Sequence, residues 1–578
     1  MIRNKIFIYF QGKIKGFFSK KLTEFGTWNK MDIQLRQDFM RFWQSFMRRF
    51  PILFVLLICL SFLFSVWACT TLPKKFDLVI QNGFIIDGTG NPWFKADIGI
   101  QEGRIARIGS IDDKQAKEII DAQGLIVSPG FIDIHTHCDR GIVRIPTVDN
   151  YIYQGVTSVI GGNCGGHPFP LKELFSKIED KGIALNFGCL VGHNTIRREV
   201  MGMKMEAPSE EEMERMKSLV HQEMEAGALG FSTGLSYLPG AYSGKEELVE
   251  LASVIIGFGG VYATHLRDQG LHITEAIEEA IEIGETNNIP VQISHIKLAD
   301  DAVWYQLARI IEPVENARQR GVEVTLDQYP YTATSSGFGS SFPSWAFEGG
   351  NESFLKRLES EENYAKIKSY IIQRRLTSTK GINKPETIYI ANSEKFPEYV
   401  GKNLQEILLS QGKDPTIENT ADLIIEIQKN GGASGVFFQM NEKDVEDLMR
   451  LPYTMHGSDG SIQVKGRGVP HPRNYGTFPR VISHYVRKRG VISLEEAIRK
   501  MTSLPAQTFR LKQRGMIREG FYADITIFDK NRFEDKATFS APHQYNQGLH
   551  YVIVNGKLVV ENGEHSGKQA GMVLYRMD

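Results

Sequence analysis

The chain has 578 residues, of which 42% are hydrophobic and 23% are charged, a balance typical of globular proteins. Its formal net charge of −1 excludes the broad positive field that holds nucleic acids, so we expect no nucleic-acid partner. The five cysteines are too few for a disulfide framework, and no Cys-x-x-Cys zinc pattern occurs. Function must therefore be argued from a local site.

The N-terminal part is typical of an export signal. Within residues 47–69, an uncharged apolar run follows Arg48 and Arg49 and ends at Cys69. The junction Val66-Trp-Ala-Cys69 is similar to a bacterial lipobox. We expect cleavage and lipid attachment at Cys69, and export to the bacterial cell envelope or periplasm. A plain signal peptide and an uncleaved membrane anchor remain open as alternatives.

Residues 1–46 precede this signal as a basic leader with scattered aromatic residues. Signal peptides rarely follow so long a leader. We therefore expect translation to begin at Met40 or Met47, so that the leader is not translated. The alternative is a cytoplasmic extension that forms an amphipathic surface helix.

Two β-rich segments flank a long middle region. In residues 76–128, apolar or alternating runs such as Phe76-Asp-Leu-Val-Ile are separated by turn pairs such as Asp87-Gly88. Residues 510–565 have the same character, with Tyr551-Val-Ile-Val before Asn555-Gly. We expect both ends of the mature chain to build one small β-sandwich domain.

Residues 129–509 alternate candidate strands with candidate helices, such as residues 209–226, 273–287 and 303–320. Repeated strand–helix units predict parallel strands joined by right-handed crossovers, and eight units close a TIM-like (β/α)₈ barrel. The fold class is therefore α/β. We expect residues 338–450, between the seventh and eighth strands, to form an inserted subdomain or lid. The eight candidate strands end near His137, Cys164, His193, Thr233, His265, His295, Gln328 and Asp459.

Five of these apolar runs end in a potential metal ligand, at the end of the barrel where active sites lie. His135 and His137 are two residues apart, so a strand would place both on one face, about 7 Å apart. Cys164 lies in Gly161-Gly-Asn-Cys-Gly-Gly166, where glycines allow close backbone approach. His265, His295 and Asp459 end three further runs. Imidazole and thiolate ligands favour zinc over magnesium or calcium, in a site for one or two ions.

This constellation resembles the amidohydrolase superfamily and, within it, the D-aminoacylase (N-acyl-D-amino-acid deacylase) family. The resemblance covers nearly all of residues 76–564. Cysteine as the ligand of the second strand is its most discriminating feature, because many other amidohydrolases use a carboxylated lysine. The motifs that carry the resemblance are Pro129-Gly-Phe-Ile-Asp-Ile-His-Thr-His137, Gly161-Gly-Asn-Cys-Gly165, Gly230-Phe-Ser-Thr-Gly-Leu-Ser-Tyr237, Thr264-His-Leu-Arg267, Ser294-His-Ile-Lys297, Asp327-Gln-Tyr-Pro-Tyr331, Gly457-Ser-Asp-Gly460 and His471-Pro-Arg473.

The resemblance implies a role for each matching residue. It implies one tightly bound zinc ion and a second, weaker site, with Asp459 also the catalytic base. The tight site would comprise Cys164, His265 and His295, and the weaker site His135, His137 and Asp459. The residues that would grip the substrate carboxylate are Lys297, Tyr329, Ser335 and Arg473, with Tyr237 near the scissile carbonyl.

The expected function is zinc-dependent hydrolysis of N-acyl-D-amino acids, which releases a carboxylate and a free D-amino acid. The residues themselves support metal-dependent amide hydrolysis, whereas the D configuration follows only from the resemblance. Alternatives are hydrolysis of another small amide, such as a dipeptide, a hydantoin or another cyclic amide, or an inactive binding protein. A structural envelope protein tethered by its lipid is a further alternative. The oligomeric state stays open.

Overall fold

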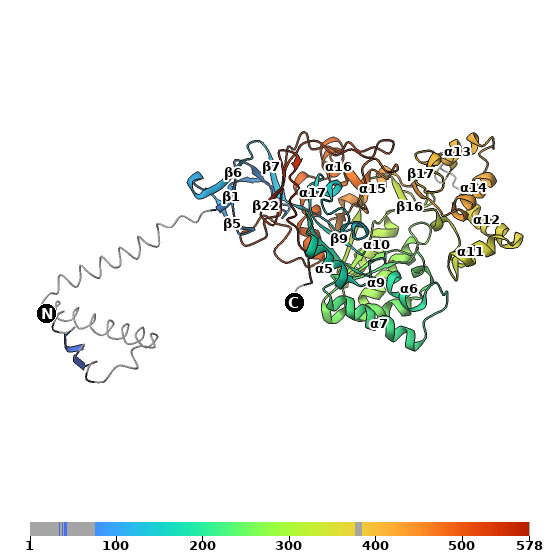
Figure 1. Ribbon diagram of the computed structural model, residues 1–578, viewed down its shortest axis with the longest axis horizontal. Coiled ribbons are helices and arrows are strands. Elements are labelled where there is room, and N and C mark those ends of the chain that lie inside the picture. Colours follow the sequence, from blue (N-terminus) through green and yellow to red (C-terminus); the bar gives the residue numbers. More distant parts are fainter. Residues whose placement is uncertain are drawn as a thin grey trace. The chain divides into compact units, whose positions relative to one another are not determined.

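The computed structural model describes residues 76–375 and 384–576, together with a few separate helical positions between 34 and 45 (Figure 1). The expected signal segment with Cys69 lies outside the described residues, as does most of the basic leader. In the described part of the chain, no helix has the length and apolar character needed to span a bilayer. The chain divides into two compact units, 1–74 and 75–578, and the second contains all the features below.

The centre of this second unit is a set of parallel strands in chain order. One parallel sheet has the order β10-β9-β8 and a second has the order β11-β12-β13-β14-β15-β19. The expected repetition of parallel strands is thus found. The strands are β8 (Phe131–Asp133), β9 (Val156–Gly161), β10 (Asn186–Cys189), β11 (Val191–Gly192), β12 (Gly230–Gly234), β13 (Val261–His265), β14 (Val291–Ile293), β15 (Val324–Gln328) and β19 (Thr454–His456).

Backbone hydrogen bonds continue between these two sheets. Only Leu190 separates β10 from β11, so the two form one strand position, and Leu229 N donates to Cys189 O at 2.9 Å. At the other edges, the segment after β8 meets the segment after β19 through a parallel bridge between Thr136 and Gly460. Asp459 N donates to His135 O at 2.8 Å. Eight strand positions therefore follow one another, with contacts between the first and the last.

The connecting helices begin where the sequence supplies capping groups. Ser209 caps α7 in a capping box with Glu212. The helix expected over 303–320 begins later, at Ala308, because Asp300 accepts a hydrogen bond from Ala302 N and fixes a turn. The helices of this region are α4 (Asp149–Ile152), α5 (Leu171–Lys181), α6 (His193–Met201), α7 (Glu210–Glu225), α8 (Lys245–Ser253), α9 (Ile273–Asn287), α10 (Ala308–Gln319), α15 (Glu442–Arg450), α16 (Arg473–Arg480), α17 (Leu494–Met501) and α18 (Ser503–Thr508).

The two β-rich ends form two sheets with a common core. The first has the order β5-β4-β1-β6, and the second, β23-β22-β21-β20-β7-β2-β3, joins N-terminal and C-terminal strands. Apolar side chains of both sheets, such as Ile80 and Ile527, form one buried cluster. The strands are β1 (Phe76–Gln81), β2 (Phe84–Ile85), β3 (Phe94–Lys95), β4 (Asp97–Gln101), β5 (Arg104–Gly109), β6 (Ala116–Asp121), β7 (Ile126–Pro129), β20 (Ile525–Phe528), β21 (Leu549–Val554), β22 (Lys557–Glu561) and β23 (Glu564–His565).

The insertion after β15 has its own antiparallel sheet, with the order β16-β18-β17, and its own apolar cluster around Phe338 and Phe354. It starts at Ala333, earlier than the expected residue 338. The sequence of β16, Ala-Thr-Ser-Ser-Gly, is polar and lacks an apolar run, so the residue pattern did not indicate a strand there. It ends at Phe438, since α15 packs on β15 and β19. Figure 1 shows its helices together beside β16 and β17. Its elements are β16 (Ala333–Gly337), α11 (Asn351–Leu358), α12 (Glu361–Arg375), β17 (Ile388–Asn392), α13 (Leu404–Ser410), α14 (Ile417–Lys429) and β18 (Ser434–Phe438).

Candidate metal centre and adjoining cavity

Three of the predicted ligands lie where the backbone turns sharply after a strand. Cys164, His295 and Asp459 follow β9, β14 and β19, with φ values of 53°, 36° and 49°. A left-handed backbone at a non-glycine residue costs roughly 1–3 kcal/mol, and such strain concentrates at functional sites. The strands thus end in turns that carry the expected ligands.

The thiol of Cys164 lies among three imidazoles. Its Sγ is 3.4 Å from His135 Nε2, 3.6 Å from His265 Nδ1 and 3.5 Å from His295 Nε2. A tetrahedral zinc ion with ordinary Zn–S and Zn–N bonds would hold sulfur and nitrogen about 3.5 Å apart. Both the ligand types and their spacing therefore fit a zinc ion.

A second group adjoins the first and shares His135. His137 Nε2 is 3.1 Å from Asp459 Oδ1, and His135 Nε2 is 3.7 Å from the same oxygen. Within each of two sets of residues, the ligand atoms all lie within 4.8 Å of one another. One set is His135, Cys164 and His295, and the other is His135, His137 and Asp459. The structure therefore brings all six predicted ligands together and places His135 in both groups, while His265 touches only the Cys164 side.

The electrostatics of this cluster favour the ionised forms of its thiol and of its carboxyl group. Burial alone would raise the pKa of the Cys164 thiol, but His135 and His295 hold this pKa well below its usual value. Burial likewise opposes ionisation of Asp459, yet the Arg473 guanidinium, with Nη1 2.8 Å from Oδ2, keeps the pKa of this carboxyl well below its usual range. Metal ligation requires deprotonated thiol and carboxyl groups, so the cluster suits a cation.

Each histidine around Cys164 has a polar partner at the ring nitrogen that does not face the Cys164 sulfur. His135 Nδ1 is 3.2 Å from Asp327 Oδ2, and His265 Nε2 is 2.7 Å from Ser236 Oγ. His295 Nδ1 is 3.2 Å from Gln269 Nε2. Such partners fix the orientation of ligand imidazoles. Sequence reasoning gave no role to these partners, although Asp327 ends an apolar strand as the ligands do.

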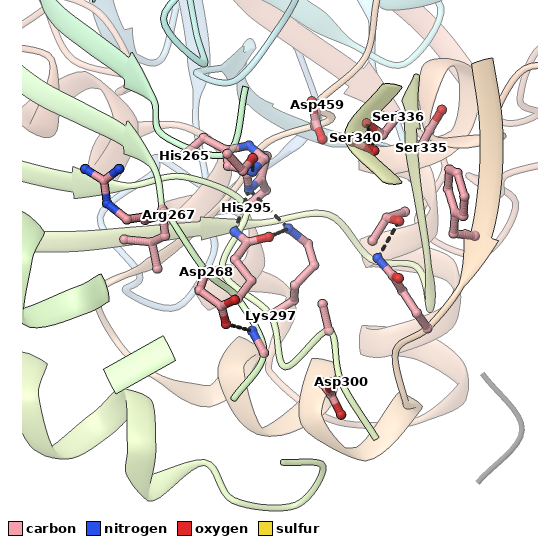
Figure 2. Close-up of a pocket in the computed structure, with 18 of the residues that line it drawn as sticks. His265, Arg267, Asp268, His295, Lys297, Asp300, Ser335, Ser336, Ser340 and Asp459 are labelled. Atoms are coloured by element: carbon pink, nitrogen blue, oxygen red, sulfur yellow. Dashed lines mark hydrogen bonds between the residues drawn. The ribbon is translucent and has the colours of Figure 1, made fainter. Parts of the chain in front are cut away.

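A cavity of about 170 Å³ opens over His265, His295 and Asp459. Figure 2 shows Lys297 on one side of it and Ser335, Ser336 and Ser340 on another. The three serines come from β16 and the residues after it, so the insertion supplies part of the lining. Four of the predicted substrate-binding residues line the cavity: Tyr237, Lys297, Tyr329 and Ser335.

The fifth predicted substrate-binding residue, Arg473, is buried beside this cavity. The Tyr329 ring lies between two cations, with Arg473 Cζ 4.8 Å and Lys297 Nζ 5.4 Å from its centre. Lys297 Nζ also donates to Gln269 Oε1 at 2.9 Å. Burial lowers the pKa of Lys297 to about 7, partly offset by the charge of Asp459. Two basic groups and an aromatic ring thus gather next to the metal ligands.

Comparisons with known proteins agree with this geometry. A model of the amidohydrolase family matches residues 118–320 and 413–560. A D-aminoacylase from Alcaligenes xylosoxydans xylosoxydans is 36% identical over 87% of this chain and 98% of its own length. An N-acyl-D-glutamate deacylase from the same organism is 32% identical, with the same coverage of 87% and 98%.

Two solved structures are similar over most of the chain. One is an N-acyl-D-glutamate deacylase from Bordetella bronchiseptica in complex with zinc and a phosphonate that mimics the tetrahedral intermediate. It has a TM-score of 0.73 and 31% identity, over 87% of this chain and all of that one. The other, a D-aminoacylase studied for its binuclear metal centre, has a TM-score of 0.74 and 34% identity, over 86% of this chain and all of that one.

Proposed function

Because this chain belongs to the amidohydrolase family, in its D-aminoacylase branch, we propose that it removes the acyl group from N-acyl-D-amino acids by hydrolysis of their amide bond. The products are a carboxylate and a free D-amino acid. The observation that carries the proposal is the Cys164 thiol among three imidazoles, next to a cavity with a cationic side. This arrangement suits a small amide that carries a carboxylate.

The metal is zinc in this proposal. Cys164, His265 and His295 hold one ion tightly with help from His135, and a second, weaker site comprises His135, His137 and Asp459. When bound, zinc supplies Lewis-acid polarisation of the amide carbonyl and activation of a water near neutral pH.

The side chain of Asp459 moves the proton. It is the carboxylate within the ligand set, with Oδ2 held by Arg473 and Oδ1 facing His137. It accepts the proton of the attacking water and later delivers it to the leaving amide nitrogen. Burial raises the pKa of Tyr237 well above its usual value, so its phenol remains a hydrogen-bond donor for the carbonyl oxygen as negative charge develops.

Recognition of the substrate carboxylate falls to the cationic side of the cavity. Arg473 offers two parallel N–H donors, the geometry that a carboxylate accepts best, and Lys297 adds a compact positive charge. Tyr329 holds both cations in place through its ring. Ser335 supplies a hydroxyl from the insertion.

The test is a substrate panel with the zinc-loaded protein. We expect amine release from N-acetyl-D-amino acids and little from the L isomers, dipeptides or hydantoins. If no N-acetyl-D-amino acid releases an amine while a dipeptide or hydantoin is cleaved, the reaction is a different amide hydrolysis. If nothing is cleaved although zinc is bound, the binding-protein alternative holds.

We also propose that the eight strand positions close into a (β/α)₈ barrel and that the insertion acts as a wall or lid of its active site.

The remaining proposal is export with a lipid at Cys69, as the lipobox-like junction suggests. Metabolic labelling with palmitate should mark the intact chain and not the Cys69→Ala variant. Label that persists in Cys69→Ala would overturn the lipidation.

A further inference from the structure

Three polar groups meet at the ring nitrogen of His295 that faces away from Cys164. Gln269 Nε2 lies 3.2 Å and Lys297 Nζ 3.1 Å from His295 Nδ1. Lys297 Nζ also donates to Gln269 Oε1 at 2.9 Å, which closes a triangle of contacts. Figure 2 shows Lys297 directed toward His295. Lys297 is buried, Gln269 is half-buried, and both line the cavity.

This triangle pairs donors with acceptors only while His295 Nδ1 carries no proton. The carboxamide nitrogen of Gln269 and the ammonium group of Lys297 are both donors, so Nδ1 has to be the acceptor. The proton of a neutral imidazole then lies on Nε2, which faces the Cys164 sulfur at 3.5 Å. In this tautomer, Nε2 has no lone pair to offer a metal ion.

Ligation of zinc through Nε2 requires the opposite tautomer of His295. The proton then lies on Nδ1, and the triangle contains three donor groups but a single acceptor, Gln269 Oε1. Exchanging the oxygen and nitrogen of the carboxamide does not remove the conflict. If Oε1 faces the Nδ1 proton, Nε2 lies against the ammonium group of Lys297, and if Nε2 faces Nδ1, two donors meet there. One contact of the triangle therefore has to break when the metal binds.

We infer that the Gln269 carboxamide turns to accept the Nδ1 proton of His295 when zinc binds, and that this turn releases Lys297 toward the substrate carboxylate. A half-turn about the last side-chain bond exchanges Oε1 and Nε2 at nearly the same positions. Lys297 is the group that can leave, because its ammonium ends a flexible four-carbon stem and finds a charged acceptor in the substrate.

This inference rests on the proposed function, from which it takes the zinc ion and the carboxylate-binding role of Lys297. It adds Gln269 as a positioning residue that acts through His295 and Lys297. The occupancy of the metal site and the grip on the substrate are then coupled through one carboxamide.

Two substitutions test this coupling in the full chain. Gln269→Met keeps the length of the side chain but removes the acceptor for the Nδ1 proton, so zinc should bind about 10–100-fold more weakly. Gln269→Glu supplies a charged acceptor, so zinc should bind at least as tightly. Its ion pair with Lys297 should nevertheless compete with the substrate and raise KM for N-acetyl-D-leucine about tenfold, with little change in kcat.

Competition with a chelator measures the zinc affinity of each variant, and initial rates at saturating zinc separate KM from kcat. The matched control is Gln306→Glu, which adds the same charge at an exposed position outside the described lining residues. It should change neither zinc affinity nor KM. Damage to the site without coupling would weaken zinc and substrate binding together, whereas the coupling predicts opposite changes in Gln269→Glu.

An unchanged zinc dissociation constant in Gln269→Met would overturn the inference, because Lys297 would then stay at His295 and accept the Nδ1 proton as a neutral amine. Weaker zinc binding in Gln269→Glu, or an unchanged KM in this variant, would overturn it as well. Failure of the proposed function has a different sign, namely no turnover of any N-acetyl-D-amino acid by the unmodified zinc-loaded chain. The zinc affinities need no turnover and would still decide the role of Gln269.

Discussion

The cavity has two sides that differ in how tightly their side chains are held. The ligand side consists of His135, His137, Cys164, His265, His295 and Asp459. Three of its histidines, His135, His265 and His295, are held at one ring nitrogen by Asp327, Ser236 and Gln269. The insertion side consists of Thr334, Ser335, Ser336, Ser340, Phe437 and Gln439.

On the insertion side, the side chains are mostly half-buried, and their hydrogen bonds run mainly to one another or to their own loop. This difference indicates that the two sides of the cavity have different roles. In the proposed function, the ligand side sets the metal and the chemistry, and the insertion side sets which amide is accepted. Substitutions on the ligand side should therefore change metal content or kcat, and substitutions on the insertion side should change KM and substrate preference.

The largest effect should come from Cys164→Ala, because it removes the thiolate that the three imidazoles surround. We expect loss of the tightly bound zinc and a fall in kcat of at least about 10³-fold, since Lewis-acid activation contributes several kcal/mol. Metal analysis and initial rates measure the two effects. Cys189→Ala, which alters a buried cysteine outside the ligand set, is the matched control and should keep both metal and activity. Full zinc content in Cys164→Ala would contradict the assignment.

The second-largest effect on activity should come from Asp459→Asn. The amide keeps the shape of the carboxylate but cannot accept the proton of the attacking water, so kcat should fall by about 10²–10⁴-fold. The zinc bound near Cys164 should stay, because the weaker site alone uses Asp459. Rates and metal content of the same preparation test this prediction. A kcat equal to that of the unmodified protein would remove Asp459 from the role of base.

Asp327→Asn tests whether the tight hold on the ligand side matters for the metal. Asp327 joins His135 Nδ1, at 3.2 Å, to the backbone N of His295, at 2.9 Å, through its two oxygens. Replacing it should weaken zinc affinity about 10–100-fold. At saturating zinc, kcat should change far less than in Asp459→Asn. Competition with a chelator measures the affinity, and an unchanged zinc dissociation constant would show that the histidines are held by other contacts.

The sequence predicted the ligand side better than the insertion side, for a physical reason. A ligand at the end of an apolar strand is visible in sequence, because strand length and side-chain alternation are local properties. The partners of the ligands are not visible. Asp327 meets His295 only because β14 and β15 pair with Ile293 opposite Leu326, a register that no local pattern specifies.

The insertion was even harder to predict from local sequence patterns. Strand β16 contains Ala333-Thr-Ser-Ser-Gly337, which lacks the apolar alternation typical of a strand. It becomes a strand because β18 pairs with it across a separation of about a hundred residues, for example at Ser335 and Val436. Among the residues of the insertion side, only Ser335 was predicted to bind the substrate. That assignment came from the family resemblance rather than from the residue pattern. Tertiary pairing therefore decides where this wall lies.

Ser335→Ala should have the smallest effect and gives the sharpest comparison between the two sides. It removes one hydroxyl from the grip on the substrate carboxylate and touches no metal ligand. Loss of one hydrogen bond to a charged group corresponds to about 1.5–3 kcal/mol, but a half-exposed hydroxyl can be replaced by water, so we expect about a 3–10-fold rise in KM. Zinc content and kcat should remain near those of Ser353→Ala, a control on α11 away from the cavity lining. If Ser335→Ala lowered zinc content or kcat while KM stayed constant, the insertion would take part in the chemistry, and the division between the two sides would fail.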